Sequence, residues 1–315
     1  MPIDFSNCEI RTPENPLELQ HLYGMLAEVF PTEKKLFEDI ISGAHTLYSW
    51  KPYTLYYADE PVGNVSIVMF QLQTEGRLQK IAGIASVATP ERYRGMGVAR
   101  HLMNHVLKVI DAQNLPSILF TSLPRVYAGL GYQLVDQGVK QTAVRQLGQV
   151  NVPVQRLTHL TGEALDTIKK LYSETLSYDG KLLRDEKYWR LYGNAANNSD
   201  KTEFAFCMSG DKVSGYARLE YESDRVLLEE FYASAESLTN TALWNWICAA
   251  AAEKGKHLVS LALPRKHSLW NFLQINDLPL MQEAGVEREV FMVRMPQKES
   301  TAWLAELRWA LSDKF

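Results

Sequence analysis

Several features are scarce in this sequence of 315 residues, and each scarcity excludes a class of protein. Cysteine occurs only at Cys8, Cys207 and Cys248, without a C-x-x-C pair, which predicts reduced thiols rather than a disulfide framework. No apolar run approaches the ~20 residues that a membrane span needs. The N-terminus lacks the charged and apolar regions of a signal peptide. Together these absences predict a cytoplasmic protein without a membrane segment.

Basic residues are also no more numerous than acidic ones. The formal net charge is −4, with 33 Lys and Arg residues against 37 Asp and Glu residues. Proteins that bind nucleic acid generally carry a basic stripe, so the sequence predicts no nucleic-acid partner. Hydrophobic residues make up 46% of the chain, which is ordinary for a globular protein, and the length suits two domains.

The most informative segment is a glycine-containing turn between a predicted strand, 81–89, and a predicted helix, 96–112. Residues 89–100 read Thr-Pro-Glu-Arg-Tyr-Arg-Gly-Met-Gly-Val-Ala-Arg. Glycines let the backbone approach an anion, and the N–H groups at a helix start have no intrahelical partner. The pattern predicts a site for a pyrophosphate-bearing cofactor, although it is neither a dinucleotide fingerprint nor a nucleotide-triphosphate loop. A basic turn that only caps a core helix is the alternative.

A second motif follows about thirty residues later, after a predicted strand, 117–123. Residues 124–132 read Pro-Arg-Val-Tyr-Ala-Gly-Leu-Gly-Tyr. The pair of motifs, Arg-x-x-Gly-x-Gly at 92–97 and Tyr-x-x-x-Gly-Tyr at 127–132, resembles the GNAT (Gcn5-related) N-acetyltransferases, with the Eis-type acetyltransferases as the most similar branch. The resemblance implies that acetyl-CoA is the acyl donor and that CoA is a product.

In this resemblance the end of the strand at 81–89 pairs with the pantetheine arm as an added strand would. Two arginines and the backbone N–H groups of the loop hold the phosphates. The cofactor-binding residues implied are Val87, Ala88, Thr89, Arg92, Arg94, Gly95, Met96, Gly97, Val98 and Ala99.

The resemblance also implies catalytic roles. Tyr127 is expected to give a proton to the departing thiolate, because a tyrosine is protonated at neutral pH; a core aromatic is the alternative. The strand at 81–89 contains no acid to act as general base. In Eis-type enzymes the terminal carboxylate takes that role, so Phe315 is the candidate here, with a frayed chain end as the alternative.

The second half of the chain reads as a weakened copy of the first. We therefore predict a mixed α/β fold of two tandem GNAT-like domains, 1–148 and 149–315. The loop that corresponds to the phosphate loop, 234–237, contains no glycine and no arginine but does contain Glu236, so the second domain is expected to be degenerate. The sterol-carrier-like third domain of Eis-type chains is missing, and an amphipathic helix is predicted at 301–311 instead.

Two functions stay open at this point. The first is an N-acetyltransferase that acts on a small amine, an aminoglycoside-like compound or a protein amine. The second is a non-catalytic acyl-CoA sensor or interaction protein. No metal site is expected, because His101 and His105 lack a third ligand. The acids at 220–230 are expected on a solvated strand face, or facing a cleft where they would attract a cation. The sequence does not predict the oligomeric state.

Overall fold

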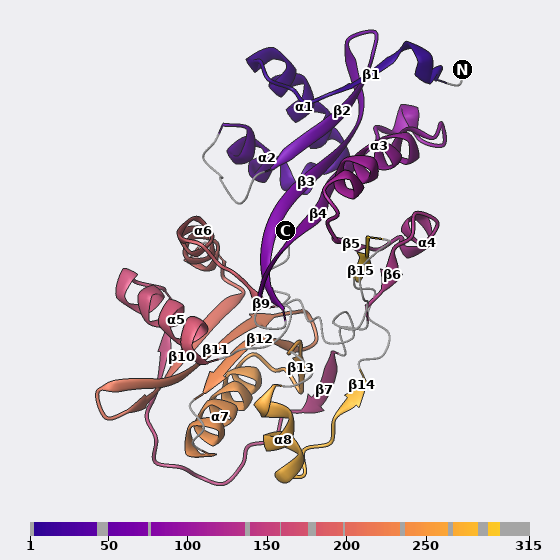
Figure 1. The fold of residues 1–315 in the computed structure, drawn as a ribbon. Helices are drawn as coiled ribbons and strands as arrows, with labels where there is room; N and C mark the ends of the chain where they lie inside the picture. Colours follow the sequence, from indigo (N-terminus) through magenta and orange to yellow (C-terminus); the bar gives the residue numbers. More distant parts are fainter. Residues whose placement is uncertain are drawn as a thin grey trace.

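The computed structural model describes residues 3–42, 50–74, 77–135, 139–157, 159–175, 181–197, 199–233, 237–263, 267–282 and 289–296. These residues form two mixed β-sheets with helices packed on them (Figure 1). The predicted α/β fold class is confirmed. The helix predicted at 301–311 lies outside the described residues. No helix in the described part of the chain is long and apolar enough to cross a membrane.

The first sheet follows the order β1-β2-β3-β4-β5-β15-β6, with β9 paired to β3. Only β4 and β5 run parallel among these described pairs. Its strands are β1 (Cys8–Arg11), β2 (Lys51–Tyr57), β3 (Glu60–Thr74), β4 (Arg77–Ala88), β5 (Ser117–Thr121), β6 (Gln133–Leu134), β9 (Lys181–Leu182) and β15 (Val290–Arg294). Its helices are α1 (Pro16–Val29), α2 (Lys34–Ile41), α3 (Val98–Ala112) and α4 (Pro124–Ala128), with short 3-10 turns at Phe5–Asn7, Pro31–Glu33 and Glu91–Tyr93. We call this sheet with its helices the first unit.

Helices of the first unit begin at the signals that the sequence carries. The Asn15 side chain caps α1 by accepting a hydrogen bond from Glu18 N at 2.9 Å, and Pro16 fills the first helical position. The buried side chains of α3 recur every three or four residues and pack in one cluster with β2–β5. They are Val98, Leu102, Met103, Val106, Leu107 and Ile110.

The second sheet follows the order β14-β7-β13-β12-β11-β10-β8. Its strands are β7 (Lys140–Ala143), β8 (Val154–Leu157), β10 (Thr202–Ser209), β11 (Lys212–Tyr221), β12 (Val226–Ala233), β13 (Leu258–Leu261) and β14 (Met281–Gln282). Its helices are α5 (Gly162–Thr175), α6 (Glu186–Asn197), α7 (Ser237–Glu253) and α8 (Ser268–Ile275). We call this sheet with its helices the second unit.

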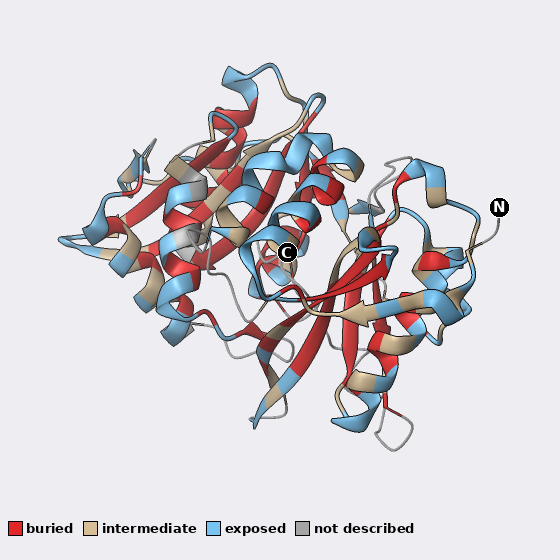
Figure 2. Cartoon of the chain, turned by 90° about the horizontal axis from the view of Figure 1, so that it is seen from above, coloured by how far each residue is buried: buried red, intermediate tan, exposed pale blue. Residues whose placement is uncertain are grey.

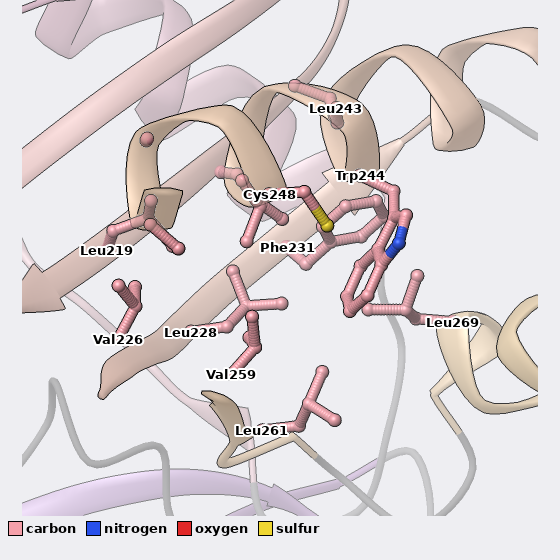
Figure 3. Packing of buried hydrophobic residues seen from close by; sticks show 14 of the residues in the cluster. Leu219, Val226, Leu228, Phe231, Leu243, Trp244, Cys248, Val259, Leu261 and Leu269 are labelled. Carbon is pink, nitrogen blue, oxygen red and sulfur yellow. The ribbon is translucent and has the colours of Figure 1, made fainter. Parts of the chain in front are cut away.

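An apolar core joins α7 to the second sheet. Figure 3 shows Trp244 of α7 beside Leu228 of β12, Val259 of β13 and Leu269 of α8. The Trp244 indole N–H donates to the backbone oxygen of Arg145 at 3.0 Å. The segment that follows β7 is therefore held against α7, although the sequence shows no periodicity there.

The two units exchange strands. β7 precedes the predicted boundary at 148, yet it pairs with β13 and β14 of the second sheet. β15 lies near the end of the chain, yet it pairs with β5 and β6 of the first sheet. The predicted ranges 1–148 and 149–315 therefore do not separate the two sheets, and the domain limits stay a prediction.

A shared hydrophobic cluster also joins the units. Alternate side chains of β3 face opposite sides of the first sheet, so Val65 and Ile67 pack with α3 while Val68 and Phe70 pack with the second unit. In Figure 2 the buried positions run along the strands, and the outward sides of the helices are exposed. The strand exchange and this cluster make each unit depend on the other for its core.

Acidic residues near β12 do not all lie where the sequence suggested. Glu229 and Glu230 are buried rather than on a solvated face. Glu230 forms an ion pair with buried Arg184 at 2.5 Å, and Glu229 pairs with Arg218 at 2.8 Å. Two arginines from other elements neutralise these carboxylates, so neither acid is available to attract a cationic ligand.

Candidate functional site

A bulge in β4 shapes the candidate site. The register between β3 and β4 shifts by one residue, so Ser86 and Val87 together face a single residue of β3. Ser86 has a φ of 48°, a conformation that costs a non-glycine residue of order 1 kcal/mol or more and that is concentrated at functional sites. The buried Asn64 side chain holds the bulge, because its Nδ2 donates to the backbone oxygen of Ser86 at 3.0 Å.

The pairing of β4 with β5 ends before the bulge. The described ladder between them contains only the pairs Ala82↔Ser117 and Gly83↔Ile118. β4 continues to Ala88 while paired with β3 on its other side. From residue 84 onward, the edge of β4 that faces β5 is therefore not covered by a described strand, and it offers backbone groups to an extended ligand.

The chain then turns through two glycines into α3. Gly95 and Gly97 have φ values of 75° and 85°, in the left-handed region that glycine adopts without strain. Gly97 is the N-cap of α3, and no side chain caps it. The first hydrogen bond of the helix runs from His101 N to Gly97 O, so the N–H groups just before His101 point out of the helix end. Free N–H groups and the positive end of the helix dipole both favour a negative charge there. The start of α3 can therefore bind an anion.

Side chains around this turn have specific partners. Arg92 Nη1 lies 3.1 Å and 3.2 Å from the two carboxylate oxygens of Glu28, in an exposed pair that links the turn to α1. Arg94 Nε donates to the backbone oxygen of Thr89 at 3.3 Å. The hydroxyl of Thr89 is buried and, among the described residues, has no hydrogen-bond partner. An arriving phosphate or amide could provide that missing partner, so the turn fits an anionic ligand.

Tyr127 lies on α4, directly after β5. Its ring packs edge-on to Tyr132 with centroids 6.1 Å apart, and both rings join the cluster that contains Val98 and borders Val87. Burial raises the pKa of Tyr127, and the negative charge of Glu289 raises it further. No described residue forms a hydrogen bond with the Tyr127 hydroxyl. The phenol is therefore held protonated and is available as a donor.

Tyr132 supports the fold near Tyr127. Its hydroxyl is 2.8 Å from the hydroxyl of Ser117, and burial raises its pKa. The hydrogen bond ties the segment that follows α4 to the start of β5, on the other side of the helix that carries Tyr127.

The structure therefore brings most of the predicted site residues to one edge of the first sheet. Val87, Ala88 and the turn that follows them lie at the carboxyl end of β4, and Tyr127 follows the carboxyl end of the parallel strand β5. Phe315 lies outside the described residues, so its role stays a prediction. No group of three metal-ligating side chains occurs in the described ranges.

Sequence reasoning missed Glu289. This residue directly precedes β15, which is separated from Tyr127 by more than 150 residues and reaches the first sheet only through the strand exchange. No local signal in the sequence could have placed it beside α4.

In the second unit, the strand that corresponds to β4 is β12, and its edge is occupied by a side chain. A Cβ built on Gly63 would lie 3.2 Å from Ala88 O, and one built on Gly215 would lie 2.5 Å from Tyr232 O. Gly63 and Gly215 thus occupy corresponding positions, each against a backbone oxygen of the neighbouring strand. Ala88 of the first unit therefore corresponds to Tyr232 of the second, and Val87 corresponds to Phe231.

In the second unit a histidine occupies that edge. His267 Nδ1 accepts a hydrogen bond from Leu269 N at 3.1 Å, so Nε2 carries the proton and donates to Phe231 O at 2.7 Å. Burial lowers the pKa of His267 to about 4, which keeps the ring neutral. The side chain thus closes the edge of β12 at the position that corresponds to Val87 of β4.

Comparison with known proteins agrees with this fold. Residues 10–135 match the family model of the acetyltransferase (GNAT) domain. This stretch contains both the glycine turn and Tyr127, and it forms a GNAT domain. The two sheets of the chain also fit two GNAT-like units, the arrangement found in a tandem GNAT protein. No curated protein sequence matches the chain.

Solved structures share the whole arrangement at low sequence identity. A GCN5-related N-acetyltransferase from Anabaena variabilis is 18% identical, with a TM-score of 0.66 over 92% of this chain and 73% of that chain. Eis1 from Mycobacterium abscessus is 14% identical, with a TM-score of 0.62 over 91% of this chain and 73% of that one. A tandem GNAT protein from the clavulanic acid biosynthesis pathway is 11% identical, with a TM-score of 0.52 over 93% and 100% of the two chains. These similarities show the fold.

Proposed function

We propose that this protein is an acetyl-CoA-dependent N-acetyltransferase that acts on an amine acceptor. The observation that carries the proposal is the open edge of β4, which leads through two left-handed glycines into the uncapped start of α3. An extended arm and a diphosphate are the two parts of CoA that such an edge and such a helix start can bind.

In this proposal the backbone does most of the binding. The segment Val87–Thr89 pairs with the pantetheine arm, and the N–H groups of residues 94–99 surround the diphosphate. Arg94 and Arg92 add positive charge, although Arg92 must share its charge with Glu28. When bound, acetyl-CoA supplies an acetyl group that is activated as a thioester. The side chains of Met96, Val98 and Ala99 need only pack.

Tyr127 acts as the proton donor in this proposal. Its raised pKa keeps the phenol protonated at neutral pH, so a proton is ready for the sulfur atom as that atom leaves. The acceptor nitrogen must be neutral when it attacks. The β4 strand provides no carboxylate to remove its proton, because residues 81–89 contain no acid.

The missing acid on β4 favours a second candidate function, a non-catalytic acyl-CoA sensor. Both candidates use the same binding edge, and they differ in turnover. We also place the protein in the cytoplasm, because Cys8, Cys207 and Cys248 are all free thiols, which suits a reducing compartment.

A thiol-release assay with acetyl-CoA separates the two functions. The acceptor panel contains a polyamine, an aminoglycoside, a lysine-containing peptide and a peptide with a free N-terminus. Release that depends on one class of acceptor supports the enzyme and names the class. CoA binding without release above the hydrolysis background for any acceptor supports the sensor, and absence of CoA binding contradicts both.

A further inference from the structure

An arginine from the exchanged strand β15 holds the end of the helix that carries Tyr127. β15 lies between β5 and β6, in the part of the first sheet that borders α4 (Figure 1). Arg294 is its last residue, and the Nε of this side chain donates to the backbone oxygen of Leu130 at 3.2 Å. Leu130 lies in the turn that closes α4, where Tyr132 N donates back to Tyr127 O at 3.3 Å. The contact therefore fixes the turn to which the backbone of Tyr127 is bonded.

The same arginine is also joined to α3, the helix whose start is proposed to bind the diphosphate. Nη1 and Nη2 of Arg294 donate to the two carboxylate oxygens of Asp111, near the end of α3, at 2.5 Å and 2.8 Å. A bidentate arginine–carboxylate pair fixes the relative orientation of its two partners as well as contributing energy. One side chain thus connects β15, α3 and the turn after α4.

The second unit contains a corresponding arginine contact. β7 pairs there with β13 and β14, just as β15 pairs with β5 and β6 in the first unit. Arg145 follows β7 closely, and its Nη2 donates to the backbone oxygens of Asn276 at 2.6 Å and Asp277 at 2.9 Å. Both oxygens lie in the turn that ends α8. In each unit, an arginine at the end of the exchanged strand therefore holds the end of the short helix.

The turns after α4 and α8 can be matched residue by residue. Leu278 N donates to Leu273 O at 3.0 Å, as Tyr132 N does to Tyr127 O. The residue before the donor has a positive φ in both turns, which is a common way to end a helix. Leu273 therefore occupies the position of Tyr127. The arginine contact by itself supports the helix end, because it is present in a unit without the tyrosine.

The ion pair to the long helix distinguishes the two units. Asn114 N donates to Asp111 O at 3.0 Å at the end of α3, and Gly255 N donates to Ala252 O at 2.9 Å at the end of α7. Both donors have a positive φ, 52° for Asn114 and 66° for Gly255. Ala252 therefore corresponds to Asp111, and it has no carboxylate to bind an arginine. The unit with the proposed proton donor has the acid at this position, and the other unit has a methyl group.

We infer that Arg294 and Asp111 form a positioning pair that holds Tyr127 at a fixed place relative to the start of α3. Proton transfer to the departing sulfur requires the phenol within hydrogen-bond reach, and a displacement of about 1 Å can cost about 100-fold in rate. The inference rests on the proposed acetyltransferase function with Tyr127 as donor. It gives the exchanged strand a role in the reaction, because the second half of the chain supplies the arginine that orients the donor of the first unit.

The test compares kcat for the full chain with and without the donor. We expect Arg294→Met and Asp111→Asn each to lower kcat about tenfold and to change the Kd for CoA less than twofold. In a Tyr127→Phe background, the same substitutions should change kcat less than twofold, because no donor remains to be misplaced. Arg294→Lys keeps the charge but only one of the two contacts, so it should recover part of the loss.

Arg145→Met is the matched control. It removes the corresponding arginine contact of the second unit, where Leu273 occupies the donor position. It should lower the melting temperature about as much as Arg294→Met does and leave kcat unchanged. An equal loss of kcat with and without Tyr127 would overturn the inference, because the pair would then act on the fold alone. Unchanged kcat in Arg294→Met, or an equal loss of kcat in Arg145→Met, would overturn it as well.

Amide hydrogen exchange gives a readout that does not depend on catalysis or on CoA. The Tyr132 amide is bonded to Tyr127 O, so Arg294→Met should speed its exchange about tenfold, whereas Arg145→Met should not. If wild type acetylates no acceptor, or if Tyr127→Phe keeps the wild-type kcat, the proposed function or the donor role fails on its own. The exchange of the Tyr132 amide still decides whether the pair fixes the helix end, and an unchanged rate overturns the inference.

Discussion

Replacing Gly97 by alanine tests the turn that begins α3. A Cβ at this position would meet only the Phe5 ring, at 3.8 Å and 3.9 Å, which is ordinary van der Waals contact. The substitution therefore creates no clash, and its effect comes from the backbone. At a φ of 85°, an alanine costs about 1–2 kcal/mol relative to glycine.

The protein can absorb that cost in two ways. If the turn keeps its shape, the free energy of unfolding falls by that amount, which lowers the melting temperature by about 2–4 °C per kcal/mol. If the turn relaxes instead, the N–H groups at the start of α3 rotate away from the diphosphate. A hydrogen bond to a charged group contributes about 1.5–3 kcal/mol, so losing one weakens CoA binding about tenfold or more.

Calorimetry and thermal melting measure both effects. CoA is compared with pantetheine, which lacks the diphosphate and should bind wild type and Gly97→Ala equally. Gly24→Ala is the matched control, because Gly24 lies inside α1 with nothing within 4 Å of a built Cβ. An alanine there should raise stability by about 1 kcal/mol and leave CoA binding unchanged. Gly97→Asn should retain more function, since asparagine tolerates the left-handed region.

The reasoning would be refuted by a Gly97→Ala protein that melts like wild type and binds CoA as tightly. It would also be refuted by equal losses of affinity for CoA and for pantetheine, because the turn would then not contact the diphosphate.

Three further predictions concern other residues. Tyr127→Phe should lower kcat about 100-fold and change the Kd for CoA less than twofold; unchanged kcat would remove Tyr127 from the mechanism. Asn64→Ala leaves the hydroxyls of Thr54 and Ser66 and the backbone oxygen of Ser86 without their partner. It should lower the free energy of unfolding by about 3 kcal/mol and weaken CoA binding, because the bulge loses its support. A melting curve like that of wild type would count against this network. His267 has a folded pKa of about 4 against about 6.5 when unfolded, so its stabilisation is complete above pH 6.5 and is lost as the pH falls toward 4. It amounts to about 3 kcal/mol, and a difference in stability between wild type and His267→Gln that did not shrink over this range would contradict the assignment.

Local features of the first unit could be predicted from the sequence. The glycine turn, the periodic apolar face of α3 and the Asn15-Pro16 start of α1 each carry their own signal within a few residues. The structure places the predicted turn residues together because they are contiguous in the chain. Tyr127 joins them because β4 and β5 are parallel neighbours, so the carboxyl ends of both strands lie at the same edge of the sheet.

Features that depend on distant pairing could not be predicted. β7 and β15 are each short, and nothing in their own pattern tells which sheet they will join. For the same reason the position of Glu289 was missed. The acids Glu229 and Glu230 look like a solvated strand face until Arg218 and Arg184 are brought to them by other elements. The closure of the second unit by His267 likewise depends on a contact across 36 residues.

A crystal structure of the protein with CoA tests the central claim most directly. The account predicts one CoA molecule per chain, with its pantetheine arm along β4 beyond Gly83 and its diphosphate at the N–H groups of residues 94–99. Density for CoA at the start of α7, or no CoA at the first unit under saturating conditions, would contradict it.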